Sequence, residues 1–134
     1  MYLVDTNVLS DARRGRQEAR AWLRSVDPDQ VFVSVITLGE ISKGIALKGQ
    51  SDPVAAASLG LWLEQLTTLH AARILPIDQD VAIEWSRITA LRPRPPADAL
   101  IAATARVRRK ILVTRNVADF TGLGLTILDP WGQP

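Results

Sequence analysis

The sequence contains no cysteine and only one histidine, and these two scarcities exclude several kinds of functional site. Without cysteine the chain can form no disulfide, no thiolate zinc site and no cysteine nucleophile. The one imidazole, His70, excludes a metal centre built from several histidines. The missing cysteines are also compatible with a reducing cytosol.

Long hydrophobic runs are absent as well. No apolar stretch approaches the roughly 18 residues that a membrane span requires. Residues 1–5, Met-Tyr-Leu-Val-Asp, show no basic region followed by an apolar stretch, so they do not resemble a secretory signal. We therefore expect a cytoplasmic protein with no membrane partner.

The bulk composition is that of an ordinary globular protein. Of the 134 residues, 47% are hydrophobic and 22% are charged, which predicts a single domain over residues 1–134. The formal net charge is +2, and 13 of the 16 basic residues are arginine. This arginine excess is compatible with phosphate binding but does not establish it.

Short runs of β-forming residues alternate with helical patterns along the chain. We expect helices over residues 8–12, 17–26, 37–48, 54–69, 81–90 and 97–109, and strands over residues 3–4, 31–33, 74–77, 111–114 and 125–128. Pro76 favours an edge position or a strand end for the third strand. The alternation predicts an α/β fold, an α/β/α sandwich with a mostly parallel five-stranded sheet. Ligands of such sheets bind beyond the carboxyl ends of the strands.

Four acidic residues are predicted to lie at that edge. Asp5 follows the first strand, and Glu40 follows the apolar run 31–36. Asp98 lies in the first turn of the helix over 97–109, and Asp119 lies in the polar turn after the fourth strand. Carboxylates brought together must bind protons or share a cation. The four acids therefore form a candidate site for a hard metal ion.

Each acid also has an ordinary structural interpretation. Asp5 would cap the helix that follows it, and Glu40 would complete a capping box with Thr37. Asp98 would interact favourably with a helix dipole, worth roughly 0.3–1 kcal/mol, and Asp119 would stabilise a turn. The coincidence of all four at one predicted edge favours the functional interpretation.

Four segments in this order resemble the PIN-domain ribonucleases, in particular VapC and FitB-like toxins of bacterial toxin–antitoxin pairs. The segments are LVDTNV at 3–8, VSVITLGE at 33–40, DALIAATA at 98–105 and LVTRNVADF at 112–120. The resemblance implies a compact α/β/α fold and an endoribonuclease that depends on Mg²⁺ or Mn²⁺. All-oxygen ligands suit these ions. A metal held by carboxylates can activate water and neutralise charge on a scissile phosphate.

The resemblance also assigns roles to residues of the site. Asp5, Glu40 and Asp98 match the three most regular acids of the family. Some relatives carry a fourth acid where this chain has Asn116, and others carry it where this chain has Asp119. Asp119 is therefore the acid available here for the fourth position. We expect Asp5 and Asp98 to bind a first ion, Glu40 to bind water or a second ion, and Asp119 to close the site. Orienting roles fall to Thr6, Asn7, Thr114 and Asn116.

Basic residues fall into a near group and a far group. The near group, which favours RNA binding, is Arg13, Arg14, Arg16, Arg92 and Arg94. Arg115 fits a phosphate contact and an ordinary surface position equally well. The far group, residues 106–110, lies roughly 15–18 Å from Asp98 along its helix, and the helix dipole accounts for its cations.

The aromatic residues and the histidine have structural interpretations. Trp22, Trp62 and Trp85 lie on apolar helical stripes and are expected in a core or an interface, and Trp131 is expected to pack the end of the chain. His70 lies at a helix end, where the dipole accounts for it.

The resemblance implies a cognate antitoxin protein, an RNA substrate and dimer formation, with DNA bound only through the antitoxin. The apolar helix over 55–69 fits such an interface or the core. One alternative is a PIN-like module that only binds a partner. Another is a different magnesium enzyme, but haloacid-dehalogenase-like phosphatases require an acid where this chain has Asn7. Receiver domains require a lysine near the end of the fourth strand, and none lies there.

Overall fold

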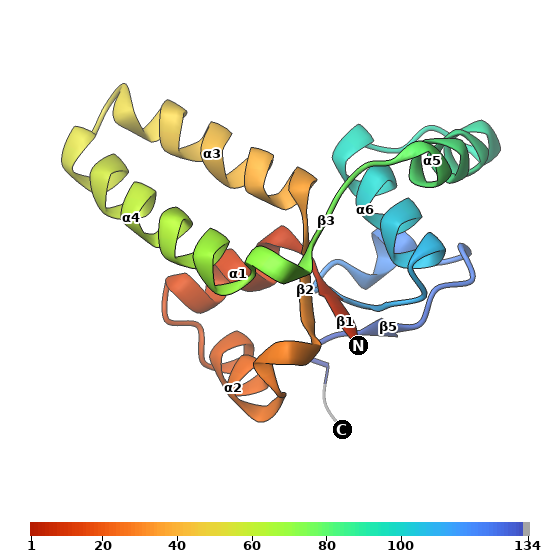
Figure 1. The fold of residues 1–134 in the computed structure, drawn as a ribbon, viewed down its shortest axis with the longest axis horizontal. Coiled ribbons are helices and arrows are strands. Elements are labelled where there is room, and N and C mark those ends of the chain that lie inside the picture. The colour runs from red at the N-terminus through yellow and green to blue at the C-terminus, as the bar shows by residue number, and fades with distance from the viewer. Residues whose placement is uncertain (133–134) are drawn as a thin grey trace.

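The computed structural model describes residues 1–132, and a sheet of five parallel strands forms its centre (Figure 1). The strands are β1 (Tyr2–Val4), β2 (Val31–Ser34), β3 (Ile74–Leu75), β4 (Ile111–Val113) and β5 (Ile127–Leu128). Their order is β3-β2-β1-β4-β5, and every neighbouring pair is parallel. The predicted fold class is confirmed, and the strand before Pro76 lies at an edge as expected.

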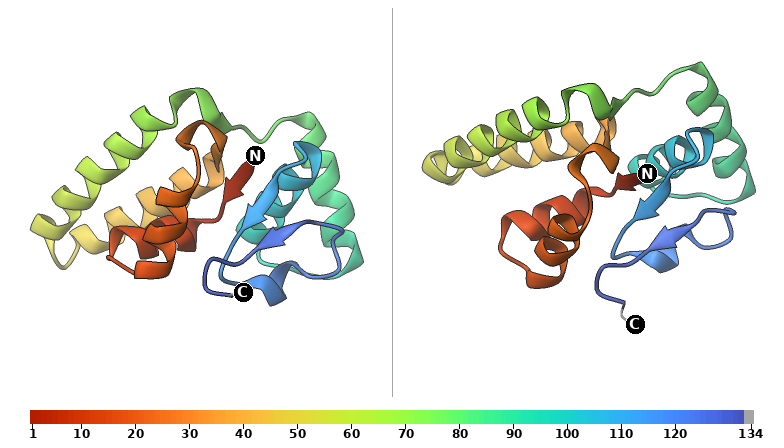
Figure 2. Two further views of the ribbon diagram at one scale, coloured as in Figure 1. Left: turned by 90° about the horizontal axis from the view of Figure 1, so that it is seen from below. Right: turned by 60° about the horizontal axis from the view of Figure 1, so that its bottom comes forward.

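Helices follow the strands and cover both sides of the sheet. They are α1 (Thr6–Arg13), α2 (Gln17–Ser25), α3 (Val35–Gly49), α4 (Pro53–Leu69), α5 (Gln79–Leu91) and α6 (Pro96–Val107), with 3₁₀ turns at Pro28–Gln30, Ala71–Arg73 and Val117–Phe120. Helices α3 and α4 pack together as a hairpin that projects from one side of the molecule, while α5 and α6 pack on the other (Figures 1 and 2). Within residues 1–132, no helix combines the length and apolar character needed to cross a bilayer.

Alternating side chains of the central strands build two hydrophobic cores, one on each face of the sheet. Leu3 and Leu112 point into the core beneath α5 and α6, together with Ile88 and Ile101. The next residues along these strands, which include Val4, point into the core beneath α1 to α4.

The tryptophans border these two cores as expected. Trp22, Trp62 and Trp131 pack against the core beneath α1 to α4, and Trp85 packs against the other. Trp22 also meets the ring of Tyr2 edge to face, with 5.1 Å between centroids. The helical stripes therefore predicted correctly that Trp22, Trp62 and Trp85 pack against a core, although each side chain stays partly exposed.

Helix α3 begins two residues earlier than predicted, and this changes the interpretation of Glu40. The hydroxyl of Ser34 accepts a hydrogen bond from the amide of Ile36 at 3.0 Å, so Ser34 is the N-cap. Thr37 consequently lies inside the helix and is fully buried. The predicted capping box of Thr37 and Glu40 is wrong because a better placed hydroxyl precedes it in the chain.

Other helix boundaries also differ from the prediction. Helix α1 begins at Thr6 because Asp5 caps it, and α5 begins at Gln79 because the Asp78 carboxylate accepts from the amide of Val81 at 3.0 Å. Helix α6 ends at Val107 and not at Arg109, because Arg109 adopts a positive φ of 54° and reverses the chain.

Candidate active site

Asp5 lies at the junction of β1 and α1 and is almost completely buried, with 4% of its surface exposed. Its Oδ1 accepts a hydrogen bond from the backbone amide of Thr6 at 2.8 Å, so the predicted helix cap is present. Its Oδ2 accepts from the Thr114 hydroxyl at 2.8 Å and from the Asn7 amide at 3.2 Å. The side chains of Asn7, which follows β1, and Thr114, which follows β4, therefore hold this carboxylate in place.

Glu40 reaches the same edge from the second turn of α3. Its carboxylate is exposed, and its Oε1 accepts a hydrogen bond from the Thr6 hydroxyl at 2.7 Å. The Thr6 hydroxyl also lies 3.0 Å from that of the buried Thr37. Thr6 thus links the helix that follows Asp5 to the helix that carries Glu40.

Asp98 lies half-buried in the first turn of α6, as predicted, and Asp119 lies exposed in the 3₁₀ turn after β4. The backbone carbonyl of Asp119 accepts a hydrogen bond from Arg94 at 2.7 Å, and its amide donates to the carbonyl of Asn116. The amide of Asn116 in turn donates to the Thr114 hydroxyl at 3.1 Å. This turn is therefore tied to the residue that holds Asp5.

The four carboxylates influence one another electrostatically. The pKa of Asp5 is raised from 3.8 to about 6, chiefly by burial and in smaller part by the charges of Asp98 and Glu40, against the hydrogen bonds from Thr114 and Thr6. Burial also raises the pKa of Asp98, and the charges of Asp119 and Glu40 add to the effect. The acids predicted to converge therefore share one edge of the sheet.

The donor set fits a hard divalent cation, because every candidate ligand is a carboxylate or an uncharged oxygen. Within residues 1–132, however, no three acidic or histidine side chains stand close enough together to hold one ion. The backbone places the acids at one edge, where the side chains of Glu40 and Asp119 are exposed.

The near arginines have different surroundings. Arg13 donates to the Ser58 hydroxyl at 3.3 Å, Arg14 lies 3.5 Å from Asp11, and Arg94 contacts the Asp119 carbonyl. The side chains of Arg16 and Arg92 are exposed. These five residues flank the edge without sharing one role.

Asp11 is a buried acid that the sequence analysis did not single out. Only 2% of its surface is exposed, and its Oδ2 accepts a hydrogen bond from Arg115 at 2.5 Å. The Arg115 guanidinium also lies 5.5 Å from the centre of the Trp131 ring, and its backbone amide donates to Asn7 at 3.3 Å. An aspartate in a polar helical segment gives no sequence signal for burial, because its partner is 104 residues away.

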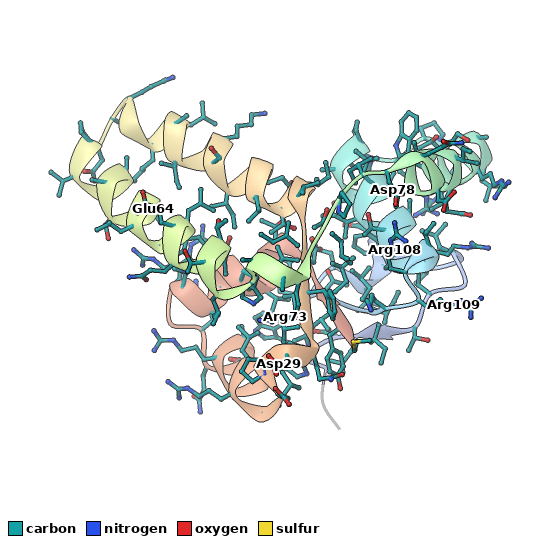
Figure 3. All side chains as sticks on the ribbon, in the orientation of Figure 1. Asp29, Glu64, Arg73, Asp78, Arg108 and Arg109 are labelled. Carbon is teal, nitrogen blue, oxygen red and sulfur yellow. The ribbon has the colours of Figure 1, made fainter. Side chains whose placement is uncertain are left out.

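The far basic group contacts protein on the side away from Asp5. Arg106 donates to the Leu123 carbonyl at 2.7 Å and lies 3.5 Å from Glu84, and Arg108 pairs with Asp78 (Figure 3). The Lys110 ammonium lies 4.1 Å from the centre of the Phe32 ring. Specific partners, more than the helix dipole, account for these cations.

Residues 2–120 match the family model described as the PIN domain. The chain belongs to the PIN-domain family. Among curated proteins, this PIN domain is 33% identical to the toxin FitB of Neisseria gonorrhoeae, over 98% of this chain and 99% of the relative. It is 29% identical to a VapC ribonuclease of Sinorhizobium fredii, over 98% of each chain.

Solved structures give the same result for the fold of the PIN domain. The crystal structure of FitAcB from Neisseria gonorrhoeae superposes with a TM-score of 0.89 at 33% identity, covering 99% of this chain and 100% of that one. A toxin–antitoxin complex from Klebsiella pneumoniae gives 0.73 at 30% identity, covering 99% and 100%. The expected family is therefore confirmed.

Proposed function

We propose that this PIN domain is a metal-dependent endoribonuclease and the toxin of a toxin–antitoxin pair. The observation that carries the proposal is the buried carboxylate of Asp5, held by hydroxyl and amide donors and flanked by the charges of Glu40 and Asp98. Relatives that span nearly the whole chain and are called toxin and ribonuclease support it.

Asp5, Glu40, Asp98 and Asp119 would hold Mg²⁺ or Mn²⁺, which supplies an activated water and neutralises charge on the scissile phosphate. Thr114 and Asn7 keep Asp5 oriented through hydrogen bonds to Oδ2, and the Thr6 amide occupies one lone pair of Oδ1, which leaves the second lone pair of Oδ1 for a cation. Thr6 orients Glu40 in the same way. Asn116, through Thr114, keeps the turn that carries Asp119 in register.

Cleavage of RNA with Mg²⁺ or Mn²⁺, and its loss in EDTA, tests this proposal. Asp5→Asn and Asp98→Asn should each lower the rate at least about 100-fold while the protein stays folded, since general acid–base and metal-held water contributions are of this size. Glu64→Gln, an exposed acid on α4, is the matched control and should keep the full rate. Full activity of either aspartate variant, or activity in EDTA, would contradict the assignment.

Metal binding can be measured without the reaction. Mn²⁺ should raise the melting temperature of the wild type, because a ligand that binds only the folded state stabilises it. Asp5→Asn should lose most of this shift, and Glu64→Gln should retain it. An equal shift in all three proteins would place the ion elsewhere.

We further propose that a cognate antitoxin protein binds this chain in the cytoplasm and connects it to DNA, and that the toxin forms a homodimer or a hetero-oligomer with it. A cavity of about 500 Å³ between α1, α2 and α4 supports a protein partner. Its walls combine apolar residues such as Leu23 and Leu69 with Arg13, Arg20 and Arg24. This chemistry suits an amphipathic acidic segment. The helix over 55–69 supplies part of that wall.

A second candidate is a PIN-like module that binds its partner without cleaving RNA. The spacing of the carboxylates, no three of which stand together in the described residues, favours this candidate. The EDTA-controlled cleavage assay separates the two candidates directly. A protein that binds its antitoxin but never cleaves RNA would be such a module.

A further inference from the structure

A second cavity, of about 380 Å³, opens directly beside Glu40 and runs between α1, α3 and α4. Thr6 and Glu40, which hydrogen bond to each other, form one end of it. Its volume lies within the roughly 300–1,000 Å³ of pockets that hold small organic ligands. The cavity is therefore continuous with the candidate active site and large enough for part of a substrate.

The walls of this cavity have two different characters. Helix α4 contributes Leu59 and Trp62, and α3 contributes Ile41 and Ile45, which together make an apolar side. The opposite side is polar and carries the Ser10 hydroxyl. An apolar wall facing hydroxyl groups suits the flat base and the ribose of a nucleotide.

Two cations extend the polar side away from Glu40. Arg14, the C-cap of α1, lines the cavity and keeps 68% of its side chain exposed, although it lies 3.5 Å from Asp11. Lys48 lines it from α3, and among the described residues no carboxylate pairs with its ammonium group. Glu40, Gly44 and Lys48 are four residues apart and share one helical face. Lys48 therefore lies roughly 12 Å beyond Glu40 along the helix.

We infer that this cavity is a nucleotide-binding subsite for RNA on one side of the scissile phosphate. The inference rests on the proposed function, because it places the reacting phosphate at the carboxylate edge. The neighbouring nucleotide lies against Trp62 and Leu59, and the next phosphate along the strand lies between Arg14 and Lys48. The cavity thus positions the substrate, while the carboxylates perform the reaction.

Gly44 provides the sharpest test. It lines the cavity, and a Cβ added to it meets no atom within 4 Å, so a side chain there enters open space. Gly60 on α4 is a matched control, because a Cβ there also meets nothing within 4 Å but Gly60 does not line the cavity. Both lie inside helices, where replacing glycine favours the helix. Neither substitution should lower the melting temperature.

Gly44→Gln should raise the KM for cleavage of a short RNA at least about 10-fold with kcat within about 2-fold, Gly44→Ala should raise it less, and Gly60→Gln should leave it unchanged. Removal of uniform substrate binding has this signature. Lys48→Gln should raise KM a few-fold, whereas Lys43→Gln, on the same helix but outside the cavity, should not.

Binding provides a readout that does not require cleavage. A fluorescent ten-nucleotide RNA of mixed sequence, titrated without metal into the Asp98→Asn protein, should bind at least about 10-fold more weakly once Gly44→Gln is added. If the wild type cleaves no RNA, the proposed function fails, and this titration still tests the subsite. An unchanged affinity and KM in Gly44→Gln, a loss of kcat alone, or an equal effect of Gly60→Gln would overturn the inference. Loss of protein-partner binding with RNA affinity intact would assign the cavity to a protein.

Discussion

At the scale of single residues, Asp5 combines an observed helix cap with the proposed role of a metal ligand. The same carboxylate caps α1, accepts hydrogen bonds from Thr114 and Asn7, and faces the charges of Glu40 and Asp98. A helix cap needs one oxygen, and the buried position supplies far more constraint than a cap requires. The cap is confirmed, and it is compatible with the proposed role of Asp5 as a ligand.

Ionisation of Asp5 should lower the free energy of unfolding of the protein. Burial raises its folded pKa above 3.8 to about 6, so the folded state binds more protons than the unfolded state between these values. Stability contributed by this group is present below pH 3.8 and is lost as the pH rises through 6. A pKa change of this size corresponds to about 3 kcal/mol.

Asp5→Asn should therefore raise the free energy of unfolding at pH 8 by about 1–3 kcal/mol, while changing it little at pH 4. Urea denaturation at both pH values measures this. The lowered pKa of the buried His70 makes its own contribution fall as the pH drops below 6.5, but His70 is common to both proteins and cancels in the difference. A variant less stable than the wild type at pH 8 would contradict this account.

The same titration predicts the pH dependence of cleavage. Only the ionised carboxylate of Asp5 can bind a cation, so metal-dependent cleavage should rise through pH 6 and level off above about pH 7. Raising the Mn²⁺ concentration should move this midpoint to lower pH, because metal and proton compete for the same oxygen atoms. If the pH midpoint does not change with the Mn²⁺ concentration, the titrating group is not Asp5.

At the scale of elements, capping side chains determine where helices begin. Ser34, Asp52 and Asp78 each accept a hydrogen bond from the first turn of the helix that follows. The sequence pattern placed the cap of α3 at Thr37, because hydroxyl residues occur at both positions. In the folded protein Ser34 caps the helix, and the buried Thr37 hydroxyl instead contacts the Thr6 hydroxyl that donates to Glu40.

The end of α6 departs from ordinary helix termination. The Lys110 amide donates to the Ala105 carbonyl at 2.9 Å and the Arg109 amide to the Arg106 carbonyl at 3.3 Å, which is a Schellman motif. The left-handed position of that motif, usually glycine, is occupied here by Arg109 with φ of 54° (labelled in Figure 3). A side chain in this conformation costs energy that glycine does not pay.

Arg109→Gly should consequently raise the free energy of unfolding by about 0.5–1 kcal/mol. Arg109→Ala is the matched control: it removes the same charge but keeps a Cβ at the left-handed position, so its stability should stay near that of the wild type. Thermal or urea denaturation distinguishes them. Equal gains in both variants would point to relief of charge repulsion instead of backbone strain.

At the scale of the whole molecule, one thin sheet joins two cores that lie on opposite faces. Ile88 belongs to the core under α5 and α6, and Leu66 belongs to the other, and both are buried. The strands that separate them are two to four residues long. Both cores therefore pack against the same sheet, one on each face.

Ile88→Ala and Leu66→Ala should each lower stability by about 2–5 kcal/mol. Each variant should still unfold in a single transition, with tryptophan fluorescence and far-UV circular dichroism giving the same midpoint. The indole groups lie beside both cores, so fluorescence reports on both. Separate midpoints in either variant would show that the two halves unfold independently.

The sequence predicted the architecture well because local periodicity carried it. The five strands, their mostly parallel arrangement and the position of Asp5, Glu40 and Asp98 at one edge were expected from the alternation of strands and helices, whereas the strand order was not predicted. The sequence did not predict the burial of Asp11 or the contact of Arg115 with the Trp131 ring. The partner of Asp11, Arg115, lies far away along the chain, and local periodicity carries no information on such a pair. The assignment of Asp119, with Asn116 as the alternative, to the fourth position of the site stays a prediction.

The brevity of the outermost strands limits how other chains can engage this protein. β3 and β5 expose only two residues each along the margins of the sheet. So short a margin offers too few free amide and carbonyl groups to recruit an extended peptide by backbone pairing, which protects against fibrous self-association. A protein partner is accordingly expected to contact side chains of this molecule and not to extend its sheet.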